Sequence, residues 1–238
     1  MGSKMKMKNF LSNTNCVNPI QPSHSSPFFS NQACQDQWIC YIEFDNTKNR
    51  WQIQQNYNHI CSRRNSQSYQ CDIDYGTQLQ KMNDIVFILE SPHIFEYDFN
   101  THMPYGPAQG VTGCNIFYYL EEVINQSPHL KLDQKLDYRI VLINAIQFQT
   151  SEGIKPLDKS IRDNNFNVLW SKDFIVNDFI QRVQYFGKSA IVCNLCTKGK
   201  CKPTLHDLVN TELSKNGIAF FNGYHPSCWY VSKFRTIA

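Results

Sequence analysis

The sequence predicts an α/β protein with three α/β/α layers, in which a central sheet of four mainly parallel strands lies between helices, plus an amino-terminal extension. Two observations favour this fold class. After Asp84, short apolar runs alternate with segments that have the period of amphipathic helices. The spacing between the runs suits the helical crossovers that parallel strands need. With 238 residues, 42% of them hydrophobic, the chain can form one domain with an appendage or two small domains.

We assign residues 1–75 to the extension, packed outside the sheet, and residues 76–238 to the α/β domain. The extension is rich in Asn, Gln, Ser and Pro, and up to Ser30 this composition is typical of a poorly ordered chain. Residues 38–44 and 51–54 predict a β-hairpin around a polar turn, with a helix in the second arm as the alternative.

The elements of the α/β domain follow from the apolar pattern. Strands are predicted at Ile85–Leu89, Arg139–Asn144, Ala190–Leu195 and Ile218–Phe221. Helices are predicted at Thr112–Asn125, Ser171–Phe186 and Thr204–Lys215. We expect Ser171 and Thr204 to cap their helices, since a hydroxyl oxygen accepts hydrogen bonds from the free N–H groups of a first turn.

Two of the predicted strands run into polar turns that begin with a candidate acid or base. Glu90 follows the first strand, and His225 follows the last. Side chains just past the carboxyl ends of parallel strands line the ligand crevice of an open α/β sheet. We therefore expect Glu90 and His225 to meet over one substrate.

Four segments resemble motifs of the uracil-DNA glycosylase superfamily. Residues 89–93, Leu-Glu-Ser-Pro-His, resemble the Gly-Glu-Ala-Pro-Gly motif of its thermostable iron–sulfur branch. Residues 103–113 are similar to the Pro-Phe-Val-Gly-Arg-Ala-Gly turn into the next helix. Residues 142–146, followed by a loop with Lys155-Pro156, resemble the strand that delivers a base-reading Asn, and residues 224–227 match the His-Pro-Ser turn.

The chain also departs from these motifs. Leu89 and His93 replace the glycines on either side of Glu90-Ser91-Pro92, and Ser91 stands where other branches carry Asp or Asn, so the acidic role falls to Glu90. Phe148 stands where the iron–sulfur branch has a Cys. We therefore predict no iron–sulfur cluster and no other cofactor.

The resemblance implies a DNA glycosylase, which hydrolyses the N-glycosidic bond of a flipped base and leaves an abasic site. This reaction builds positive charge on the sugar and negative charge on the departing base, so a site needs an anion or activated water on one side and a hydrogen-bond donor on the other. Glu90 suits the first role and His225 the second. The alternatives are a solvated or cap-forming Glu90 and an ordinary loop His225.

Further residues are candidates for contacts with the base and with DNA. The predicted substrate contacts are Ser91, Pro92, Tyr105, Gly106, Gly110 and Asn144, and the predicted DNA contacts are Ser227, Trp229, Tyr230, Arg63 and Arg64. Each has a structural alternative. Asn144 can cap a loop, Tyr105 can be ordinary packing, Trp229 can be a core residue instead of a duplex wedge, and the two arginines can be a solvated pair.

The identity of the base depends on the width of the site. Gly106, Gly110 and Gly113 deprive the expected pocket wall of side chains, which favours a large base. Because the superfamily includes bacterial anti-phage enzymes that remove glucosylated hydroxymethylcytosine, we expect that substrate. The alternatives are uracil excision in DNA repair and a non-enzymatic nucleic-acid-binding module.

Composition bears on partners and location. A formal net charge of +3 permits DNA binding without requiring it, and we expect a monomer that binds duplex DNA with a flipped base. No apolar run reaches the ~18 residues of a membrane span, and the first residues lack the apolar core of a signal peptide, so we expect a cytoplasmic protein.

The ten cysteines raise one further hypothesis, a metal-dependent hydrolase or nuclease. It would use Cys193, Cys196, Cys201 and His206 as ligands. A matching second ligand pair at zinc-finger distance is missing, and Cys193 reads as a small apolar residue of a buried strand. We therefore expect structural thiols and no metal.

Overall fold

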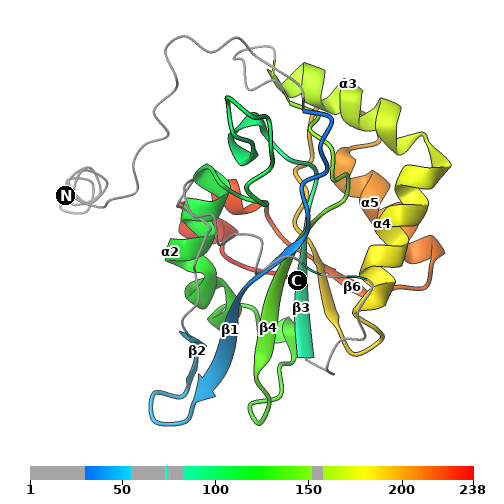
Figure 1. Cartoon of the computed structure of the whole chain (residues 1–238). Coiled ribbons are helices and arrows are strands. Elements are labelled where there is room, and N and C mark those ends of the chain that lie inside the picture. Colours follow the sequence, from blue (N-terminus) through cyan, green and yellow to red (C-terminus); the bar gives the residue numbers. More distant parts are fainter. Residues whose placement is uncertain (1–29, 55–72, 74, 76–82, 152–157) are drawn as a thin grey trace.

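A computed structural model describes residues 30–54, 73, 75, 83–151 and 158–238 of the chain. These residues form one six-stranded sheet with the order β2-β1-β4-β3-β5-β6 (Figure 1). The strands are β1 (Gln37–Asp45), β2 (Arg50–Gln54), β3 (Asn83–Leu89), β4 (Tyr138–Asn144), β5 (Ile191–Asn194) and β6 (Phe220–Asn222). Arg63, Arg64 and the loop with Lys155-Pro156 lie outside the described residues.

The four strands predicted in the α/β domain are confirmed within a few residues at each end. β4, β3, β5 and β6 lie side by side in this order, and all three pairs are parallel. β3 and β4 are apolar along most of their length, because a parallel strand that is covered on both faces meets protein on each side.

The expected number of strands was wrong, because the sheet has six strands and is mixed. β1 and β2 form the predicted hairpin, and β1 also pairs antiparallel with β4. Residues 37–54, which we placed outside the sheet, are therefore part of it. The physical reason is that β4 would otherwise leave an open edge, and the apolar side chains of Ile39, Cys40 and Ile42 make β1 a suitable cover.

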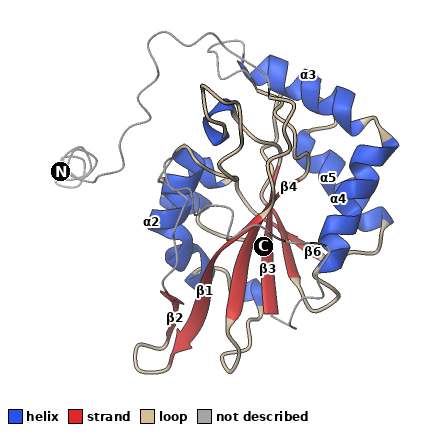
Figure 2. Cartoon of the chain, viewed as in Figure 1, coloured by secondary structure: helices blue, strands red, loops and turns tan. Residues whose placement is uncertain are grey.

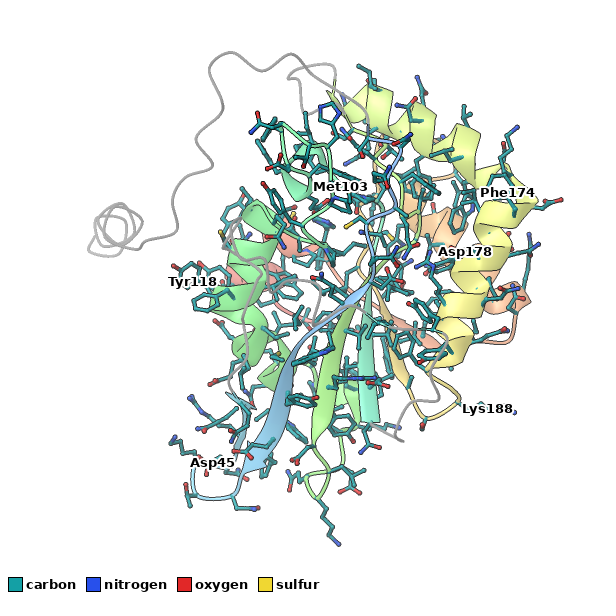
Figure 3. All side chains as sticks on the ribbon, in the orientation of Figure 1. Asp45, Met103, Tyr118, Phe174, Asp178 and Lys188 are labelled. Carbon is teal, nitrogen blue, oxygen red and sulfur yellow. The ribbon has the colours of Figure 1, made fainter. Side chains whose placement is uncertain are left out.

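Helices cover both faces of the sheet (Figure 2). On one face lies α2 (Val111–Asn125), and on the other lie α3 (Asp158–Trp170), α4 (Asp173–Tyr185) and α5 (Leu205–Lys215). Tyr118 on α2 and Phe174 on α4 point outward on opposite sides of the molecule (Figure 3). Among the residues that the structure describes, no helix is both long and apolar enough to cross a membrane.

The three predicted helices are confirmed, with one corrected cap and one helix missed. Thr204 caps α5 as expected: its hydroxyl accepts from the Asp207 N–H, and the Asp207 carboxylate accepts from the Thr204 N–H. Ser171 does not cap α4, which begins after Lys172; its hydroxyl donates to the Val168 carbonyl instead. α3 was missed because its sequence is polar, with a weak apolar stripe.

Candidate active site

Glu90 lies at the switch point of the sheet, where successive strands are added on opposite sides of β3. The chain passes from β3 to β4 on one side and then to β5 on the other side of β3. Ligands of open α/β sheets bind at such switch points, outside the carboxyl ends of the strands. Glu90 directly follows β3, and its Oε2 accepts a hydrogen bond of 3.3 Å from the backbone N–H of Thr197, three residues past β5.

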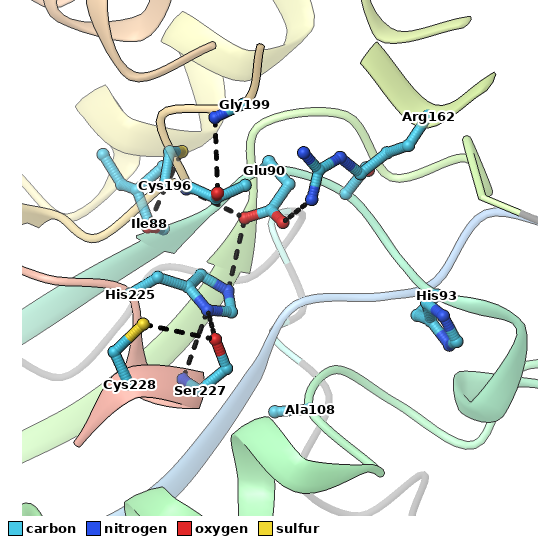
Figure 4. Close-up of polar contacts among 12 residues, drawn as sticks. Ile88, Glu90, His93, Ala108, Arg162, Cys196, Gly199, His225, Ser227 and Cys228 are labelled. Atoms are coloured by element: carbon cyan, nitrogen blue, oxygen red, sulfur yellow. Dashed lines mark hydrogen bonds and ion pairs between the residues drawn. The ribbon is translucent and has the colours of Figure 1, made fainter. Parts of the chain in front are cut away.

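The structure brings Glu90 and His225 together, as the sequence suggested. Glu90 Oε2 lies 3.3 Å from His225 Nε2, and Glu90 Oε1 lies 3.6 Å from a guanidinium nitrogen of Arg162 on α3 (Figure 4). The three side chains are largely buried, with exposed fractions of 9% for Glu90, 14% for His225 and 15% for Arg162. The carboxylate is thus held between a permanent cation and an imidazole.

The turn that carries His225 is held from two sides. Asn115 on α2 donates a hydrogen bond of 2.9 Å to the Pro226 carbonyl. The backbone N–H of Ser227 donates to His225 Nδ1 at 3.2 Å, and the Ser227 hydroxyl lies 2.8 Å from the same atom. Because Nδ1 accepts, the neutral ring carries its proton on Nε2, facing Glu90.

Burial lowers the pKa of His225 from its ordinary value of 6.5. The Glu90 carboxylate opposes this effect and the Arg162 guanidinium adds to it. The imidazole is therefore a neutral donor at physiological pH, which is the form that can hydrogen-bond a leaving group through Nε2–H.

A second buried carboxylate, Glu96, organises the loop between β3 and α2. Its side chain accepts hydrogen bonds from the backbone N–H groups of His93 and Ala108, the latter at 2.8 Å. Burial raises the pKa of Glu96 to about 7, although these two hydrogen bonds act in the opposite direction. Glu96 fixes Ala108 in a left-handed conformation, with a φ of 60°, in the turn before α2.

The glycines of that turn do not open a wide wall, which corrects our expectation. Gly106 has a φ of +126°, and a Cβ placed on it would lie 2.2 Å from the side-chain oxygen of Gln37. The space is therefore filled by a residue of β1. A Cβ on Gly110 would meet Phe95 at 3.7 Å, an ordinary contact, and Gly113 is buried within α2.

Other predicted contacts have structural partners. The Ser91 hydroxyl lies 2.6 Å from that of Thr150, and Pro92 is buried. The Tyr105 hydroxyl donates to the Asp98 carboxylate. Trp229 is fully buried and packs edge-on against Phe87, so the core alternative holds and the duplex wedge was wrong for this residue. Tyr230 is 55% exposed.

The cysteines of the metal hypothesis do not converge. Cys193 packs in the cluster on the α2 face and Cys196 in the cluster on the opposite face, and burial raises the pKa of both thiols. Within the described ranges, no group of three His, Cys, Asp or Glu side chains is placed to hold a metal ion.

Sequence reasoning missed Arg162, Glu96 and Gln37. Arg162 lies on α3, the helix that the apolar pattern did not reveal. Glu96 lies three residues after His93, and this spacing, typical of a capping box, was the available signal. Gln37 gave no signal, because its role depends on the pairing of β1 with β4.

No family model, no curated protein and no solved structure matches this chain.

Proposed function

We propose that the chain is a DNA glycosylase that hydrolyses the N-glycosidic bond of a flipped base. The observation that carries the proposal is the buried contact of Glu90 with His225 and Arg162 at the sheet's switch point. A non-enzymatic module on this fold has no need for a desolvated acid and base that converge. The motif resemblance supplies the reaction class, and the geometry supplies residues with the required chemistry.

In this mechanism the C1′–N bond breaks while a water oxygen bonds to C1′. Glu90 stabilises the positive charge that develops on the sugar and takes the proton of the attacking water. His225 donates its Nε2–H hydrogen bond to a carbonyl oxygen of the leaving base, which departs with negative charge. Before substrate binds, the same N–H faces Glu90; the base oxygen replaces the carboxylate as its acceptor.

The surface around the site suits a polyanion with exposed bases. The loop after Thr197 carries three exposed lysines, Lys198, Lys200 and Lys202, and the Lys200 backbone N–H is fixed by the buried Asp163 carboxylate at 2.6 Å. Lysine side chains at this position can neutralise phosphates.

Exposed aromatic side chains lie beside the catalytic histidine. Tyr224, directly before His225, is 46% exposed and contacts the Phe234 ring, with 4.5 Å between the ring centroids. Exposed aromatic rings stack on unpaired bases whatever the sequence of the nucleic acid. With Tyr230, these rings form the candidate contact surface for nucleotides beside the flipped base.

For the base itself, a large C5-modified cytosine, such as the glucosylated hydroxymethylcytosine of phage DNA, is the first candidate and uracil the second. Gly106 no longer supports the larger base, because Gln37 fills the space beside it. Gly110 opens no wide wall either, because a Cβ there would make an ordinary contact with Phe95 at 3.7 Å, so the support for the larger base is the resemblance to the superfamily that includes anti-phage enzymes. A cytoplasmic enzyme of anti-phage defence is the role that follows from the first candidate.

A panel of duplex oligonucleotides tests the proposal. Each duplex carries one uracil, hydroxymethylcytosine or glucosylated hydroxymethylcytosine, and alkali converts abasic sites into strand breaks. We expect breaks at one modified position and none in an unmodified duplex. Absence of breaks in the whole panel, in both single-stranded and duplex form, would contradict the proposal.

A further inference from the structure

The main chain of Asn144 is clamped by a buried ion pair. The Asp36 carboxylate accepts from the Asn144 N–H at 3.1 Å, and the Arg182 guanidinium donates to the Asn144 carbonyl at 3.0 Å. Asp36 and Arg182 contact each other at 2.6 Å and are both buried, and the Tyr75 hydroxyl donates to Asp36 at 2.6 Å. These contacts hold the end of β4 rigidly beside the Glu90 turn, where the Ile146 N–H donates to the Glu90 carbonyl.

The side-chain amide of Asn144 has a donor group without an acceptor. Its Nδ2 is buried and makes no hydrogen bond to any residue that the structure describes, and Asn144 as a whole is 1% exposed. Gln109 shows the complementary feature: its Nε2 donates to the Pro107 carbonyl at 3.3 Å, while its buried Oε1 has no hydrogen-bond donor within the described part of the chain. Buried polar groups are nearly always paired with protein, water or ligand atoms, so this donor and this acceptor are available to a ligand that supplies the matching pair.

Asn144 and the turn that carries Gln109 lie on the same side of the sheet. Asn144 pairs with Leu89, whose side chain belongs to the core cluster on the α2 face. Ala108, the neighbour of Gln109, is buried in the same cluster. Gln37, two positions from Asn144 across the β1–β4 ladder, extends over Gly106 and so connects the end of β4 with the turn.

We propose that Gln109 is a specificity-determining residue that reads the base together with Asn144. Gln109 Oε1 accepts from an N–H of the base, and Asn144 Nδ2 donates to an adjacent nitrogen or oxygen acceptor. A donor beside an acceptor is the pattern on the Watson–Crick edge of a pyrimidine. Asp36 and Arg182 act as positioning residues through the backbone of Asn144. This inference rests on the proposed function and adds a residue that was not among the predicted substrate contacts.

The test replaces Gln109 by Met, which has similar length and no polar side-chain nitrogen or oxygen. The matched control is Gln126→Met, because Gln126 lies at the other end of α2, is exposed, and donates from its carboxamide to the Glu122 carboxylate. For each protein, kcat/KM is measured on every cleaved member of the oligonucleotide panel, and the urea midpoint is measured alongside. If Gln109 had only a structural role, Gln109→Met would lower the urea midpoint and would reduce kcat/KM by the same factor on every substrate.

We expect Gln109→Met to lower kcat/KM by at least about tenfold on the preferred base and to change the ratio between bases, because one hydrogen bond in a buried site is lost. The urea midpoint should equal that of Gln126→Met. Unchanged rates and an unchanged ratio, with active wild-type protein, would overturn the assignment of Gln109.

If the wild-type protein releases no base at all, the proposed function fails, and binding then decides the inference separately. The probe is a duplex with one non-hydrolysable 2′-fluorinated pyrimidine nucleotide opposite a mismatch. Tighter binding by the wild type than by Gln109→Met supports base reading. Equal binding by the two proteins overturns it.

Discussion

Substitution of Gly106 by Ala tests the contact between β1 and the turn before α2. The new Cβ would lie 2.2 Å from the Gln37 oxygen and 2.6 Å from its amide carbon, and the φ of +126° is one that L-residues rarely adopt. Backbone strain of this kind costs ~1–3 kcal/mol, and displacement of a packed side chain adds ~1–3 kcal/mol. We predict that Gly106→Ala lowers the free energy of unfolding by about 2–6 kcal/mol in urea denaturation.

Two further proteins separate the two contributions. Gly217 has a φ of +65° and nothing within 4 Å of its Cβ position, so Gly217→Ala reports strain alone. The double variant Gln37→Ala/Gly106→Ala removes the overlap, and it should be more stable than the sum of the single effects by ~0.5–3 kcal/mol. Equal effects of Gly106→Ala and Gly217→Ala, with additive double-variant energies, would refute the packing of Gln37 over Gly106.

Three more predictions concern charge and metals. Because the pKa of Glu96 is raised to about 7, the stability that this group contributes is lost as pH rises from 4.5 through 7. Because the pKa of His225 is lowered, the stability that this group contributes is lost as pH falls below 6.5. Urea midpoints of the wild type, Glu96→Gln and His225→Ala, measured between pH 5 and 8, should show these opposite slopes. Arg139→Met should lower the free energy of unfolding in urea by ~3–5 kcal/mol, because it leaves the buried Asp84 carboxylate, 2.7 Å from Arg139, without its cation. This pair lies at the amino ends of β3 and β4, so base preference should not change. A smaller loss would mean that water reaches Asp84. Chelators should leave base release intact and purified protein should lack the visible absorption of an iron–sulfur cluster, since Phe148 replaces the expected Cys; stoichiometric iron or zinc would contradict this.

The sequence was sufficient for the parallel half of the fold and for the meeting of Glu90 with His225. Long buried strands have a distinct apolar signature, and residues after parallel strands share an edge of the sheet, so both predictions depend on local pattern and topology alone. The attachment of β1 to β4 is different. The apolar patterns of β1 and β4 do not indicate that the two strands pair, and the contacts of Gln37 and Asp36 depend on this pairing.

The remaining errors also have physical causes. α3 has few apolar positions, and its buried aromatic residues, Phe166 and Trp170, lie in its later turns. The apolar pattern therefore did not predict this helix or the position of Arg162 beside Glu90. The sequence shows that Gly106 has no side chain, but it does not show that the Gln37 side chain fills the space beside it. Tertiary packing decided each of these cases.

The measurement that tests the central claim most directly is single-turnover base release by Glu90→Gln, compared with its binding to the same duplex. The amide keeps the size of the carboxylate and removes the charge between His225 and Arg162. We predict that base release falls by ~10²–10³-fold while the dissociation constant for DNA changes by less than about threefold, because the charge acts on the transition state. Base release by Glu90→Gln at the wild-type rate would contradict the account.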